Sequence, residues 1–195
     1  MKHLKVFGLA MVAMFVLSAA AVSSASAAEL EFLASKTGLL LGELVGGPHK
    51  FATNAGTVEC ELAKADGSIT ATATLLQLAV VNYGECKVTV LNLGATITPV
   101  HYLFHTNGNV TLDNLVLVNA GSGACLIHVA PQVLSGITYA NIAGPPMELE
   151  VKANVSNISY TLSGSFCLTA TGKFANGTYK GNELTKEDGG ELLID

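Results

Sequence analysis

The chain has 195 residues, of which ten are lysine, none is arginine and 15 are acidic, giving a formal net charge of −5. This acidic balance disfavours nucleic acid and anionic membrane surfaces as partners. The length suits a single domain.

The N-terminal residues have the pattern of a secretory signal. Lys2 and Lys5 precede an apolar run at residues 6–17, and small residues follow it up to Ala25-Ser26-Ala27. This order predicts a signal peptide at residues 1–27 that is removed after Ala27. No later stretch supplies the ~18 uninterrupted apolar residues of a membrane span. We therefore expect a mature protein without a membrane span, secreted or held at the cell surface.

Apolar residues beyond the signal recur with a period of two, which is typical of strands with one buried face. In residues 147–155 every odd position is apolar and every even position is polar. Residues 158–162 alternate in the same way, so Ser156-Asn157 is predicted to be the turn of a β-hairpin. Shorter alternating runs occur at residues 58–62, 69–74, 88–90, 110–112 and 125–129.

Glycine, proline, asparagine and aspartate separate these runs about every ten residues, a spacing that favours an all-β fold. We predict an antiparallel β-sandwich, with a β-barrel as the alternative. Residues 28–181 would form a single β domain and residues 182–195 a polar C-terminal tail. Residues 37–44 and 75–80 are the only candidates for a turn or two of helix.

All four cysteines, Cys60, Cys86, Cys125 and Cys167, follow the predicted signal. An even number of cysteines in an exported chain predicts two disulfides. Three pairings are open, and we favour Cys60–Cys86 with Cys125–Cys167 because sequential bridges join neighbouring strands. A zinc site is disfavoured because no two cysteines have the close spacing of zinc ligands.

The histidines do not predict a metal site or a cofactor. His101 and His105 are four residues apart, but on a strand they would lie about 13 Å from each other at ~3.3 Å per residue. His49 and His128 are isolated, and His128 points away from the apolar side of its run.

No residue is assigned a catalytic role. The sequence lacks a G-x-S-x-G elbow, an S-x-x-K motif and a P-loop. The carboxylate pairs Glu59/Glu61 and Glu148/Glu150 are each two residues apart on one strand, so both members should point outward into solvent. A glycosidase instead needs two acids that face each other across a cleft.

Cysteine and turn positions carry a resemblance to known sequences, from about Lys50 to Gly181. They are Phe51 before Gly56-Thr57-Val58-Glu59-Cys60; Tyr83-Gly84-Glu85-Cys86; Cys125, Ile127 and Gln132; Tyr139, Ile158, Tyr160 and Cys167; and Asn176-Gly177-Thr178-Tyr179-Lys180-Gly181. On these residues the chain resembles a group of secreted, cysteine-paired β-rich proteins of Solirubrobacter-type soil actinobacteria. Members of that group often have a further cysteine pair where this chain has residues 100–118. The resemblance implies an exported bacterial β domain with sequential disulfides and implies no activity.

These observations favour an exported, non-enzymatic β-sandwich that acts as a structural or binding module at or outside the bacterial cell envelope. Its partner would be an envelope or extracellular macromolecule. Two alternatives remain open. One is an extracellular hydrolase whose site, drawn from His101, His105 or His128 with a glutamate, assembles only in three dimensions. The other is a carrier of an apolar ligand, suggested by the many small aliphatic residues that could line an interior.

Overall fold

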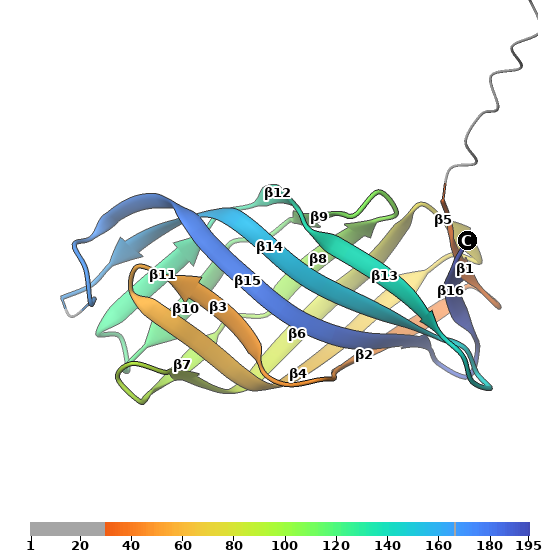
Figure 1. Cartoon of the computed structure of the whole chain (residues 1–195), viewed down its shortest axis with the longest axis horizontal. Helices are drawn as coiled ribbons and strands as arrows, with labels where there is room; N and C mark the ends of the chain where they lie inside the picture. The colour runs from red at the N-terminus through yellow and green to blue at the C-terminus, as the bar shows by residue number, and fades with distance from the viewer. Residues whose placement is uncertain (1–29, 166) are drawn as a thin grey trace, which may run out of the picture.

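A computed structural model describes residues 30–165 and 167–195, and this part of the chain consists of strands, turns and loops without a helix. Its sixteen strands are drawn in Figure 1. They are β1 (Phe32–Ala34), β2 (Gly38–Leu44), β3 (His49–Thr53), β4 (Gly56–Ile69), β5 (Thr72–Ala73), β6 (Leu75–Val88), β7 (Leu93–Ile97), β8 (Val100–His105), β9 (Asn109–Leu112), β10 (Val116–Ala120), β11 (Cys125–Val129), β12 (Gln132–Ser135), β13 (Ile137–Ile142), β14 (Glu148–Ser163), β15 (Gly172–Glu187) and β16 (Leu192–Ile194). The predicted signal peptide lies outside the described residues.

The apolar residues that alternate with polar ones in the sequence are the buried residues of the observed strands. On β14, Leu149, Val151 and Val155 are buried, whereas Lys152 and Asn154 between them are exposed. Successive side chains of a strand point to opposite faces, so the apolar set of every second residue builds the core. All observed pairings are antiparallel, and the prediction of an all-β antiparallel fold is confirmed.

The four long strands β4, β6, β14 and β15 organise the molecule. β4 pairs with β6, and β14 pairs with β15; β2 and β3 each lie between β15 and β4. On the other side, β7, β10 and β11 link β6 to β14 in the left half of Figure 1. The strand pairings therefore return to their starting point and enclose an interior.

A second set of strands covers the remaining length of β6 and β14. β8 pairs with the first part of β6, and β9 and β12 follow, while β13 pairs with β14. The amide of Gln132 on β12 completes the contact with β14: its Nε2 donates to the Ser159 carbonyl at 2.9 Å and its Oε1 accepts from the Ser159 N–H at 3.0 Å. One side chain thus takes the place of a strand's own hydrogen bonds.

Both favoured disulfides are present. Cys60 and Cys86 face each other in register on β4 and β6, and Cys125 on β11 is bonded to Cys167 in the loop that follows β14. The bridge Cys60–Cys86 joins two paired strands, as expected, whereas Cys125–Cys167 ties β11 to the loop that follows its partner strand β14.

The predicted hairpin turn at Ser156-Asn157 is wrong. β14 continues through both residues, with a shift of register between Val155 and Ile158 and a φ of 60° at Asn157. A β-bulge moves the inward positions by one residue, just as a turn between two strands can, so the sequence pattern fits both.

The two short helical candidates are also wrong, because residues 37–44 and 75–80 lie in or beside β2 and β6. Leu40 is fully buried on β2 while Leu39 and Leu41 are exposed. Apolar residues on both faces of this strand hide the alternation in the sequence.

Residues 182–195 are not a tail. β15 runs to Glu187, and β16 pairs with β1 in a small sheet with β5 at one end of the molecule (Figure 1). Leu192 on β16 is 0% exposed. The domain therefore continues past the predicted boundary at residue 181.

Candidate functional site

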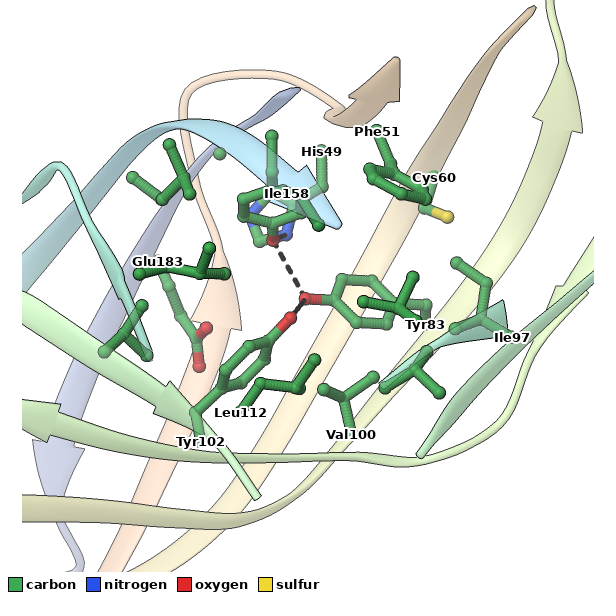
Figure 2. A pocket seen from close by; sticks show the side chains of 18 of the residues that line it. His49, Phe51, Cys60, Tyr83, Ile97, Val100, Tyr102, Leu112, Ile158 and Glu183 are labelled. Atoms are coloured by element: carbon green, nitrogen blue, oxygen red, sulfur yellow. Dashed lines mark hydrogen bonds between the residues drawn. The ribbon is translucent and has the colours of Figure 1, made fainter. Parts of the chain in front are cut away.

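The interior enclosed by the long strands contains a cavity of about 100 Å³ (Figure 2). Nearly every strand of the ring contributes to its wall, and most lining side chains are aliphatic, among them Val100, Leu112, Val118, Val151 and Val155. These side chains point inward because they occupy the buried positions of alternating strands. The cavity is thus an apolar space inside the core.

Five polar side chains interrupt this apolar lining: His49 on β3, Tyr83 on β6, Tyr102 on β8, and Tyr179 and Glu183 on β15. Figure 2 shows His49, Tyr83, Tyr102 and Glu183 pointing toward one another, and hydrogen bonds join Tyr179 to His49 and Tyr83. Tyr179 and Glu183 are four residues apart on one strand and so lie on the same face. The result is a polar wall, defined by these five residues, inside an aliphatic chamber.

The hydroxyls of the polar wall form a hydrogen-bonded chain that ends on His49. The His49 Nε2 lies 3.0 Å from the Asn182 carbonyl oxygen, its Nδ1 lies 2.7 Å from the Tyr179 hydroxyl, and Tyr83 lies 2.8 Å from Tyr179 and 3.1 Å from Tyr102. A carbonyl only accepts, so Nε2 carries the proton. Burial lowers the pKa of His49, which favours the neutral ring.

The direction of every bond in the chain follows from that tautomer. Nδ1 of His49 is an acceptor, so Tyr179 donates to it, Tyr83 donates to Tyr179 and Tyr102 donates to Tyr83. Burial raises the pKa of all three tyrosines, that of Tyr102 to about 12, so each keeps its proton near neutral pH. The chain uses every hydroxyl hydrogen and leaves only oxygen lone pairs free.

Glu183 is the one acidic residue of the polar wall. Its side chain is 6% exposed, and its Oε1 has no hydrogen-bond partner within residues 30–165 and 167–195. Burial raises the pKa of Glu183 from 4.5 to about 7, because the charged form loses its hydration. An unpartnered buried carboxyl of this kind is costly and calls for a functional explanation.

Two glycines make room for these polar groups. A Cβ at Gly181 would lie 2.6 Å from Cδ2 of the His49 ring, and a Cβ at Gly42 would collide with Oε1 of Glu183. Side chains at either position would displace the polar wall. Gly42 and Gly181 therefore provide the space that the Glu183 and His49 side chains occupy.

The predicted hydrolase residues do not assemble into a site. Nδ1 of His101 lies 3.6 Å from the Asp113 carboxylate, which exceeds hydrogen-bond distance, and both side chains are more than a third exposed. His105 bonds to Thr111 at 2.9 Å and His128 to Ser163 at 3.0 Å. None of these three histidines lines the cavity.

The carboxylate pairs on the outer face form ion pairs with lysines, as solvated strand faces commonly do. Four such contacts are present: Glu59 with Lys50 at 2.7 Å, Glu61 with Lys87 at 3.7 Å, Glu148 with Lys186 at 3.9 Å and Glu150 with Lys152 at 2.8 Å. They point outward, as the alternation predicts. In the described part of the chain, no group of three or more histidine, cysteine or acidic residues is arranged to hold a metal ion.

Sequence reasoning assigns a site role to none of the five residues of the polar wall. It predicts an isolated His49, although His49 shares the inward face of β3 with Phe51. It places Glu183 in the predicted tail. Parity along the strand was an available signal for His49, which lies two positions from the apolar Phe51, but the inner face of β15 at Glu183, Thr185 and Glu187 is polar and gives no such signal.

The described residues contain no helix long and apolar enough to cross a membrane. Comparison of the chain with protein-family models, curated proteins and solved structures gives no match.

Proposed function

We propose that this protein is an exported, non-enzymatic binding module that acts at or outside the cell envelope and holds a small, largely apolar molecule in its interior. The signal sequence predicted at residues 1–27 and the two disulfides support the export. The resemblance to secreted actinobacterial proteins points in the same direction.

The single observation that carries the binding role is the apolar cavity with a polar wall. Ligand sites are typically concave and lined by apolar side chains, with a few polar groups that orient the ligand. Here the polar groups come from β3, β6, β8 and β15, whereas β7, β10, β11 and β14 contribute only aliphatic side chains to the cavity. This arrangement fits a molecule with one polar end and one apolar end.

The size of the cavity limits the ligand. Its volume of about 100 Å³ is smaller than the cavity of about 150 Å³ that holds benzene or xenon in a protein core. The ligand should therefore have only a few non-hydrogen atoms. At about −1.5 kcal/mol per atom at best, such molecules bind with micromolar affinity or weaker.

Replacement of Ala153 by leucine is expected to abolish this binding. Ala153 lies on the inward face of β14 and lines the cavity, so a leucine would place three more carbon atoms in it. Methyl NMR of the mature chain under xenon pressure should show saturable shifts of Val151 and Val118 in the wild type and none in Ala153→Leu. Ala140→Leu is the matched control, because Ala140 on the adjacent β13 does not line the cavity.

Two results would contradict the proposal. Xenon that leaves the cavity methyl signals of the wild type unchanged would mean that the space does not accept a guest. Equal shifts in Ala153→Leu and the wild type would place the xenon somewhere else.

A further inference from the structure

The polar wall narrows the class of ligand, and this inference rests on the binding role proposed above. We propose that the ligand is a small aliphatic amine, bound as its ammonium ion, with its nitrogen between the Glu183 carboxylate and the Tyr102 hydroxyl oxygen and its alkyl chain against the valines of the cavity. Figure 2 shows the Glu183 carboxylate and the Tyr102 ring side by side at the edge of this space.

The hydrogen-bond inventory requires a ligand that donates. Tyr102, Tyr83 and Tyr179 each donate their only hydroxyl hydrogen along the chain to His49, whose own proton goes to the Asn182 carbonyl. Tyr102 is the first member of the chain and has no hydroxyl that donates to it among the described residues, so its oxygen lone pairs are free. When Glu183 is ionised, the wall can accept hydrogen bonds and has no hydrogen left to offer.

The charge inventory favours a cation over a neutral donor. Glu183 is the only acidic residue among the described residues that line the cavity, and no lysine lines it. The Glu183 carboxylate, which lines the cavity, would gain both a hydrogen bond and an opposite charge from an ammonium group, and charge-assisted hydrogen bonds are the stronger ones. An alcohol offers one neutral hydrogen, and a carboxylate ligand would be repelled.

The residues around Glu183 leave both the hydrogen bond and the opposite charge for its carboxylate to be supplied by the ligand. Its carboxyl group lies against Gly42 on β2, which has no side chain. The titratable groups that face it are Tyr102 on β8 and, on its own strand, Tyr179, with Tyr83 and His49 further along the hydrogen-bonded chain. None of them is a cation near neutral pH, because tyrosine has no cationic form and burial lowers the pKa of His49.

The protonation states set the pH range of binding. Burial brings the pKa of Glu183 to about 7, and an alkylammonium group loses its proton near ~10, as a lysine side chain does. Between these values the carboxylate and the ammonium are both charged. Below about 7 the free site takes up a proton, which must leave when the ammonium binds, so affinity falls by up to about tenfold per pH unit.

The test compares three probes with the same alkyl chain: n-propylamine, 1-propanol and propionate. Each is titrated into the mature chain at pH 8 while the methyl signals of the cavity valines are recorded by NMR. We expect n-propylamine to bind at least tenfold more tightly than 1-propanol, and propionate to give no saturable shift. In Glu183→Gln the affinity for n-propylamine should fall to that for 1-propanol.

Glu187→Gln provides the matched control. Glu187 lies on the same inward face of β15 and is 1% exposed, but its Oε2 accepts from Ser35 at 2.8 Å and it does not line the cavity. This variant should bind n-propylamine as the wild type does. Its loss of amine binding would show that burial of a carboxylate anywhere on β15, and not contact with the ligand, is responsible.

The outcomes separate this inference from the proposed function. Equal affinity for n-propylamine and 1-propanol, unchanged in Glu183→Gln, would overturn the amine assignment and leave the apolar site intact. Failure of xenon and of all three probes to bind would overturn both. Should Glu183→Gln not fold, the wild type still decides: affinity for n-propylamine that is flat between pH 5 and 8 would contradict the proposal.

Discussion

Deletion of residues 182–195 is expected to leave the remaining chain unable to fold. The deletion removes the part of β15 that pairs with β2, including the buried residues Glu183, Thr185 and Glu187. It also removes β16, whose Leu192 is fully buried and whose pairing covers β1. The ring loses the pairing of β15 with β2, and the small sheet loses β16, in a domain whose total stability is typically only ~5–15 kcal/mol.

Circular dichroism during urea denaturation checks this expectation. The full mature chain should show a cooperative transition, and the fragment of residues 28–181 should show none. Lys186→Ala is the control, since Lys186 points outward on the same strand, and its effect should stay within about 0.5 kcal/mol. A fragment that unfolds cooperatively at the same urea concentration as the full chain would contradict the observed role of β15 and β16.

The C-terminal segment shows why sequence reasoning failed there. In the run Glu183-Leu184-Thr185-Lys186-Glu187 the rule that apolar residues face the core would place Leu184 inward. The structure does the opposite: Glu183, Thr185 and Glu187 are buried and Leu184 is only partly so. A strand with a polar inner face cannot be recognised from hydrophobic alternation, because its pattern is inverted.

The second large effect is the pH dependence that Glu183 gives to the stability of the fold. Burial raises its pKa in the folded protein to about 7 from 4.5. Between these values the folded protein holds a proton that the unfolded chain releases, so the free energy of unfolding decreases as the pH rises from 4.5 through 7. A difference of this size corresponds to about 3 kcal/mol of stability lost by pH 8.

Glu183→Gln should remove this dependence, because an amide does not titrate. We expect the free energy of unfolding of the variant, measured relative to the wild type in urea, to rise by about 3 kcal/mol between pH 4.5 and pH 8. Burial lowers the pKa of His49, so this residue destabilises the fold as the pH falls below 6.5. Its contribution is the same in both proteins and cancels in the difference between their free energies of unfolding. A difference that is constant over this range, or that changes in the opposite direction, would show that Glu183 is not a desolvated carboxyl.

Features that depend on local alternation and on chain neighbours could be predicted from the sequence. The inward face of β14 up to Val155 follows from its odd-numbered apolar residues, and the favoured one of the three possible cysteine pairings is the one observed. The bulge at Asn157 could not be told from a turn, because both shift the phase of the pattern by one residue.

The polar wall depends instead on contacts between residues far apart in the chain. His49 meets Tyr179 across 130 positions, and Tyr83 meets the same tyrosine across 96. Each of these side chains is, by itself, an ordinary polar residue on a strand. Only the register of β3, β6, β8 and β15 brings them together in the cavity, and no local pattern encodes that register.

If the interior of the strand ring is a ligand site whose polar end is Glu183, a crystal of the mature protein soaked in n-propylamine at pH 8 should contain the amine. We expect density for the amine inside the cavity, with its nitrogen within hydrogen-bond distance of the Glu183 carboxylate and the Tyr102 oxygen and its carbon atoms against Val151 and Val118. A cavity that stays without the amine at saturating concentration, or an amine bound only on the outer face, would contradict this expectation.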